Sequence, residues 1–208
     1  MPADVEQRPF CMPSITLILG LLAMGALVAC LLWGWNYYML TASQRPFHPL
    51  YNLLRPGGRA GLSWGVLGTL LILFNLSYLL RRHLIGWHRL GSLRVWLGFH
   101  MMTGLIAAIA VILHSTLTVS SPLAALAFWC LQLTVVAGLS GMLIYLRLSV
   151  SVEGRQTRGH EPSASVKRLL QTWRFLHRWL AILLLMALVL HIIVTVRFGD
   201  LWMLGGQR

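Results

Sequence analysis

Long apolar runs, separated by short polar stretches, make up most of this chain. Each run reaches the roughly 20 residues that a helix needs to cross the hydrocarbon of a membrane. The pattern predicts an all-α integral membrane helical bundle of about five transmembrane helices. These belong to a single transmembrane domain over 14–198, between a polar N-terminal tail (1–13) and a short C-terminal tail (199–208). The five predicted spans are 14–39, 62–80, 93–118, 123–147 and 173–197.

The connections between the runs carry turn-forming and charged residues. The first connection, 40–61, holds three prolines and the pair Gly57-Gly58, which predicts a loop. Residues 148–172 form a second polar loop, whereas Ser120-Ser121-Pro122 predicts a very short turn. Leu27-Val28-Ala29-Cys30 resembles a lipoprotein processing site. Because apolar and aromatic residues follow Cys30, a retained helix is the expectation.

The composition supports a membrane location. Of the 208 residues, 57% are hydrophobic and 11% charged, and mean hydropathy is +0.72. The formal charge of +12 comes from basic residues at the ends of apolar runs, a pattern that indicates contact with membrane lipid. No nucleic-acid partner is therefore expected.

Lys and Arg are distributed unevenly between the two sides of the predicted bundle. With the N-terminus inside, twelve of them fall on the inner side and five on the outer side. The positive-inside rule then predicts a multi-pass protein of a bacterial-type cytoplasmic (inner) membrane, with a cytoplasmic N-terminus and a periplasmic C-terminus. The third and fifth spans consequently run parallel.

Two histidine pairs lie within the third and fifth spans. His100 and His114 are 14 residues apart, as are His177 and His191. Fourteen helical residues rise roughly 21 Å and return to within about 40° of the same face. In parallel spans, His100 lies level with His177 near one membrane surface, and His114 lies level with His191 near the other.

Histidines inside membrane spans are rare and usually functional, although some only form hydrogen bonds in a core. A proton relay would favour carboxylates, and no predicted span contains Asp or Glu. Zinc and copper sites gather their ligands within a few ångströms, unlike histidines roughly 21 Å apart. Neutral imidazole is a good axial ligand of haem iron, and two per haem suit electron transfer. The pairs therefore predict two haems between the third and fifth spans, held without thioether bonds because the chain has no CxxCH.

Residues near the histidines fit this prediction and also an ordinary alternative. Gly104 follows His100 by four residues and would leave room for a flat macrocycle, or it mediates helix packing. Four arginines could pair with haem propionates or anchor the helix ends at the membrane surface: Arg94, Arg174, Arg178 and Arg197. His83 and His88 could replace a ligand or stay solvated, and no catalytic residue is predicted.

Two helices that each carry H-x13-H, separated by one span, resemble the di-haem cytochromes b. These include the cytochrome b of quinol–cytochrome c oxidoreductases and the ferric-reductase-like transmembrane proteins. LRVWLGFHMMTGLIAAIAVILHS, VVAGLSGMLIYLRL and FLHRWLAILLLMALVLHIIV carry the resemblance, which covers about 62–198. It implies two haem b groups with bis-histidine ligation, paired as His100–His177 and His114–His191. The chain departs from the ferric-reductase kind, which usually has six spans.

These observations together predict a di-haem b-type cytochrome that carries electrons across the membrane. Its expected place is that of an oxidoreductase subunit in a larger redox complex. Its expected partners are quinone or quinol and other redox subunits that bear flavin, Fe–S clusters or c-type haem. Two alternatives stay open: a haem-free membrane anchor or assembly subunit, and a histidine-lined transporter for metal ions or protons.

Overall fold

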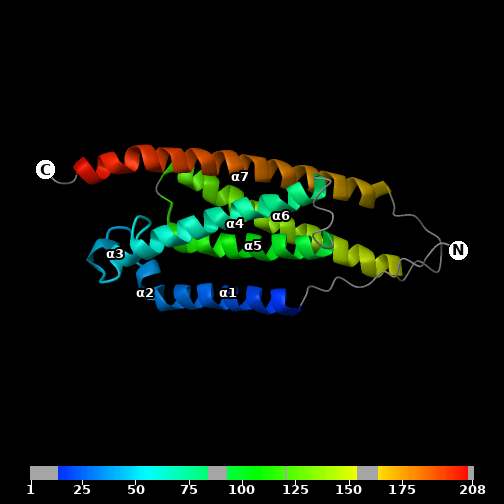
Figure 1. Cartoon of the computed structure of the whole chain (residues 1–208), viewed down its shortest axis with the longest axis horizontal. Helices are drawn as coiled ribbons and strands as arrows, with labels where there is room; N and C mark the ends of the chain where they lie inside the picture. Colours follow the sequence, from blue (N-terminus) through cyan, green and yellow to red (C-terminus); the bar gives the residue numbers. More distant parts are fainter. Residues whose placement is uncertain (1–13, 84–92, 120, 154–163, 206–208) are drawn as a thin grey trace. The chain divides into compact units, whose positions relative to one another are not determined.

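The structure is a computed structural model that describes residues 14–83, 93–119, 121–153 and 164–205. In this part of the chain every regular element is helical and no strand occurs, so the predicted all-α class is confirmed (Figure 1). The elements are α1 (Ser14–Trp33), α2 (Trp35–Tyr38), η1 (Arg45–Phe47), α3 (Tyr51–Leu54), α4 (Arg59–His83), α5 (Leu93–Ser115), α6 (Pro122–Glu153) and α7 (Ala164–Gly205).

Four of the described helical stretches are long and apolar enough to cross a membrane: Tyr51–Arg81, Val95–Ser115, Pro122–Ile144 and Ala164–Phe198. Helix α1 adds a shorter apolar stretch, Leu17–Trp33, where the first of the five spans is predicted. Large apolar side chains remain exposed on these helices, as Val136 (63%) and Val196 (69%) illustrate. Such exposure is costly in water and favourable in hydrocarbon, which indicates a multi-pass membrane protein.

Two predicted loops contain more helix than expected. The stretch 40–61 includes η1 and α3, and α4 already begins at Arg59. The stretch 148–172 is helical at both of its ends, because α6 continues to Glu153 and α7 begins at Ala164. Hydropathy marks where side chains leave the hydrocarbon, whereas a helix can continue into water wherever its backbone bonds persist.

The chain divides into two compact units, Met1–Thr116 and Leu117–Arg208. In the first unit α4 and α5 lie side by side as an antiparallel hairpin (Figure 1). A side chain at Gly68 would bring its Cβ within 2.8 Å of Val111 Cγ2, so glycine allows the two helices to approach closely. Helix α1 packs along α5, where Gly20 contacts Met102.

A buried cluster closes one end of the first unit. Leu27, Tyr37, Tyr38, Leu54 and Leu113 come from α1, α2, α3 and α5, and each is at most 4% exposed. The chain turns between α1 and α2 at Gly34, where a Cβ would lie 2.6 Å from Tyr38 Cε2. The missing side chain lets the Tyr38 ring fold back against the turn.

In the second unit α6 and α7 pack against each other. Gly141 of α6 leaves space for the indole of Trp173, whose Nε1–H donates to Ala137 O at 2.6 Å. A membrane helix pair has no hydrophobic driving force between its surfaces, so close packing and interhelical bonds of this kind hold it together.

We expect Gly68→Leu to lower the free energy of unfolding in detergent by about 1–3 kcal/mol, because the larger side chain must displace Val111. Gly25→Leu is the matched control, since nothing lies within 4 Å of a Cβ at Gly25 of α1. Denaturant titration of both variants measures the difference. An equal effect at the two glycines would contradict the packing described for α4 and α5.

Candidate functional site

Each predicted histidine pair stands on one unbroken helix. His100 and His114 belong to α5, and His177 and His191 belong to α7. All four side chains are half-buried. At the rise of an α-helix, the two members of each pair are separated by about 21 Å along the axis. Each helix therefore presents two imidazoles at two widely separated levels.

The ring of His114 is tied to the neighbouring helix of its own unit. Its Nδ1 lies 2.9 Å from the backbone oxygen of Gly61, in the first turn of α4. A carbonyl oxygen can only accept, so Nδ1 carries the hydrogen. In a neutral imidazole the other nitrogen, Nε2, is then the basic one, which is the form that binds a metal ion.

Gly65 makes this approach possible. It follows Gly61 by four residues on α4, and a Cβ there would lie 2.7 Å from His114 Nδ1 and 2.8 Å from Cε1. A larger residue would push the ring away from the carbonyl. The pair of glycines therefore forms the seat of His114 on α4.

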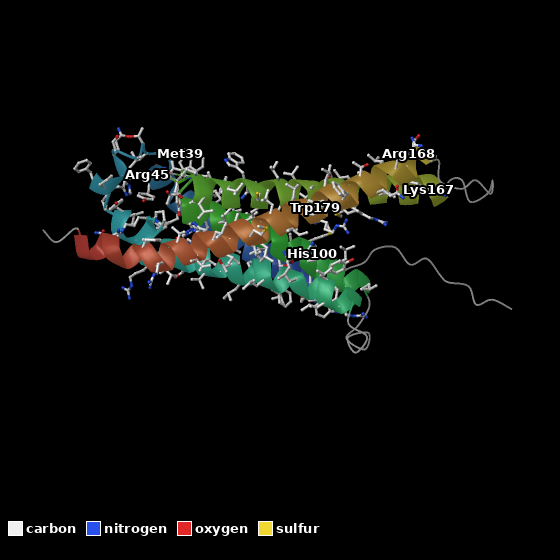
Figure 2. The ribbon with its side chains drawn as sticks, turned by 90° about the horizontal axis from the view of Figure 1, so that it is seen from above. Met39, Arg45, His100, Lys167, Arg168 and Trp179 are labelled. Atoms are coloured by element: carbon white, nitrogen blue, oxygen red, sulfur yellow. The ribbon has the colours of Figure 1, made fainter. Side chains whose placement is uncertain are left out.

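His100 also faces α4, near the opposite end of α5 from His114, and Figure 2 labels its position. Its Nδ1 lies 3.4 Å from Asn75 O, a longer contact than the one at His114. The Tyr78 ring lies beside the imidazole, with centroids 5.3 Å apart. Gly61 and Asn75 are themselves 14 residues apart, so the acceptor carbonyls of α4 repeat the spacing of the α5 histidines.

The Asn75 side chain also joins α4 to α5. In the amide orientation that satisfies both of its ends, the nitrogen donates to His100 O at 3.0 Å and to Thr103 Oγ1 at 2.6 Å. The amide oxygen accepts from Gly104 N–H at 3.2 Å. These bonds hold the backbone of α5 around His100 against α4.

His177 packs against the preceding helix of its own unit. A Cβ at Gly138 of α6 would lie 3.4 Å from His177 Cε1, which is an ordinary packing distance. The indole of Trp173 stacks on the imidazole, with centroids 5.8 Å apart and planes inclined by 21°. A glycine of the preceding helix thus lies against a histidine ring in each unit.

The other residues proposed from the sequence have varied surroundings. Gly104 lies against α4, since a Cβ there would be 3.3 Å from the side-chain amide of Asn75; a role beside a macrocycle stays a prediction. Arg174, Arg178 and Arg197 have exposed side chains on α7. Arg94 belongs to the first turn of α5, and its side chain lies outside the described part.

Two further histidines were ambiguous in the sequence. His83 is the last residue of α4, but its side chain lies outside the described part of the structure. His88 falls within 84–92, which lies outside the described residues altogether. Their part in ligation stays a prediction.

The sequence gives partial signals for the residues that seat the histidines. Gly61 and Gly65 form a small-xxx-small pair, a pattern typical of close helix contacts, and Asn75 is the one carboxamide of its predicted span. Nothing in the sequence assigns these residues to a particular histidine, because that depends on the register between two helices.

The arrangement of the histidines suits metal sites with two protein ligands each. No group of three or more His, Cys, Asp or Glu side chains occurs among the described residues. A haem ligated by two histidines needs only two protein ligands per iron. Comparison of the chain with protein-family models, with curated proteins and with solved structures finds no match in any of the three.

A side chain at Gly65 would clash with its histidine, whereas one at Gly138 would not. Alanine at the two positions should therefore change the free energy of unfolding differently. We expect Gly65→Ala to lower the free energy of unfolding by about 1–3 kcal/mol, because its Cβ must displace the His114 ring. Gly138→Ala meets only an ordinary contact of 3.4 Å and should be neutral or stabilising by up to about 1 kcal/mol, through better helix propensity. Denaturant titration of both variants gives the sign; destabilisation by Gly138→Ala alone would refute the described seats.

Proposed function

We propose that this chain is a di-haem b-type cytochrome that carries electrons across a membrane. In this proposal His100 pairs with His177 and His114 pairs with His191, and each pair supplies the two axial ligands of one haem b. The chain would act as the membrane subunit of a larger redox complex, with five spans when α1 is included.

The contact between His114 Nδ1 and Gly61 O, at 2.9 Å, is the observation that supports the proposal most directly. Metal-binding histidines commonly donate their second ring N–H to a backbone carbonyl or carboxylate, which fixes the tautomer and the ring orientation and makes the ligand nitrogen more basic. His100 has the same kind of acceptor in Asn75 O, at 3.4 Å. Each of these two histidines has a ring nitrogen near a backbone carbonyl, and they are 14 residues apart on one helix. Such an arrangement suits two separate haems better than a single metal cluster.

Haem would supply reversible one-electron chemistry, with iron alternating between the ferric and ferrous states. The chain's own residues would orient the ligands and limit the access of water. Ala107, Ala108, Ala110 and Leu113 of α5 are all at most 3% exposed, so the face of α5 that they form excludes water. The Gly61 carbonyl favours the tautomer of His114 that carries its hydrogen on Nδ1. No proton transfer is required of the predicted spans, which contain no carboxylate.

The partners and the location are part of the same proposal. Quinone or quinol is a suitable exchange partner because it dissolves in the lipid that surrounds the exposed apolar faces. Other redox subunits with flavin, Fe–S clusters or c-type haem would exchange electrons at the membrane surfaces. The surplus of Lys and Arg on one side favours a bacterial-type cytoplasmic membrane with the N-terminus in the cytoplasm.

One observation also favours a haem-free membrane anchor. The bonds from histidine to backbone carbonyls tie α5 to α4 and would serve a purely structural purpose equally well. The two functions differ in what Nε2 does, since only a cytochrome needs that nitrogen for iron.

A reduced-minus-oxidised visible spectrum with haem quantitation on the purified chain separates these functions. We expect a b-type spectrum and about two haems per chain. His114→Ala and His191→Ala should each lower the haem content to about one per chain, because each removes an axial ligand of the same haem.

His48→Ala is a suitable control, because His48 lies outside the spans and its Nδ1 accepts from Leu50 N–H at 3.2 Å. It should leave the haem content unchanged. His83→Ala and His88→Ala test the ambiguous pair in the same assay. The absence of a b-type spectrum in the wild-type chain would exclude the cytochrome, and retention of both haems by His114→Ala would exclude that ligand.

A further inference from the structure

Arg45 lies in the connection between α2 and α3 and is buried, with 6% of its surface exposed (Figure 2). Arginine is almost never fully buried unless its donors are satisfied. Arg45 starts the short η1 helix, where Pro46 follows it at once. A buried cation at this point needs an explanation that the histidine pairs do not provide.

The guanidinium of Arg45 joins two parts of the first unit. Its Nε–H donates to Leu40 O at 3.1 Å, and Nη2–H donates to Tyr38 O at 3.0 Å. Nη1–H donates to Thr116 Oγ1 at 2.8 Å, a contact that spans 71 residues of sequence. The cation also lies over the Tyr37 ring, 5.7 Å from its centroid. One side chain therefore binds the turn after α2 to the end of α5.

Thr116 terminates α5 in an unusual conformation. Its φ is +53°, and that of Leu117 is +58°, in the left-handed region that residues other than glycine rarely adopt. A β-branched residue pays a strain cost in this region, so its surroundings must hold it there. Thr116 is 2% exposed, and its hydroxyl group accepts the bond from Arg45.

His114 lies two residues before Thr116. The connection from α2 to the start of α4 therefore contacts His114 twice, once through the backbone near Thr116 and once through the ring. Gly61, where this segment runs into α4, accepts the bond from the ring through its backbone oxygen. Arg45, near the start of the segment, fixes the backbone that carries the ring through Thr116. The described hydrogen bonds of Arg45 go to Leu40, Tyr38 and Thr116, and none of them reaches the part of α5 around His100, fourteen residues from His114.

We propose that Arg45 is a positioning residue for His114: its bond to Thr116 holds the end of α5 so that the imidazole stays aligned for ligation. This inference rests on the proposed function. It assigns the role to one haem site only, the site of His114, and leaves the site of His100 unaffected. Without the hydrogen bond from Arg45, Thr116 would relax toward ordinary backbone angles, and the His114 ring would leave its aligned position for part of the time.

Binding of carbon monoxide to the reduced chain tests this selectively. Two axial histidines leave no open position on iron, so the wild-type chain should not bind carbon monoxide. In Arg45→Gln and in Thr116→Val we expect carbon monoxide to bind at no more than about one site per chain, because only the His114 ligand is released. Thr116→Val keeps the β-branched shape and removes only the hydroxyl acceptor, so it remains informative if Arg45→Gln fails to fold.

Arg55→Gln is the matched control, because Arg55 is exposed in the same segment and its guanidinium lies 5.8 Å from the Tyr51 ring centroid. Arg45→Lys keeps the charge but cannot make all three bonds, so it should give an intermediate effect. Tryptic cleavage after Arg59 gives a readout that does not depend on haem: it should be faster in Arg45→Gln than in Arg55→Gln.

The outcomes separate the two proposals. If the wild-type chain binds no haem, the proposed function fails and the positioning role fails with it. If the wild-type chain holds two haems while Arg45→Gln and Thr116→Val remain inert to carbon monoxide, only the positioning role is refuted. Equal opening of both sites in these variants would also refute it, because Arg45 would then act on the whole bundle.

Discussion

A polar side chain inside hydrocarbon must find its hydrogen-bond partners within the protein, since an unsatisfied polar group there costs about 2–7 kcal/mol. Imidazole has two polar nitrogens, and the helices of this chain supply a partner for one of them. At His114 the partner is Gly61 O, at 2.9 Å, and the space for the ring exists because Gly65 has no side chain. The close fit of α4 to α5 and the tautomer of the histidine both depend on this contact.

Similar seats occur within each of the two units. In the first, the Gly61 carbonyl and Gly65 lie against the ring of His114; in the second, Gly138 lies against the ring of His177. The preceding helix of each hairpin thus positions a ring carried by the following helix. Each hairpin therefore places a histidine ring by contacts within its own unit.

Hydropathy and the histidine spacing were enough to predict the all-α class and the helices that carry the histidines. They were not enough to place helix ends, because α6 and α7 continue for several residues into the predicted loop 148–172. The seats of the histidines depend on the register between α4 and α5, which one-dimensional patterns do not contain. Arg45 left no signal at all, since an arginine beside proline in a loop is ordinarily solvated. Its burial follows only from the contact with Thr116, 71 residues later.

The pairing of the four histidines is the central claim of this account, and haem stoichiometry in double variants tests it most directly. In the proposed pairing, His114→Ala combined with His191→Ala would remove both ligands of one haem, and the purified chain should retain about one haem. In the same pairing, His114→Ala combined with His177→Ala would remove one ligand from each haem, and the chain should retain no haem or only weakly bound haem. Equal haem content in the two double variants would contradict the pairing.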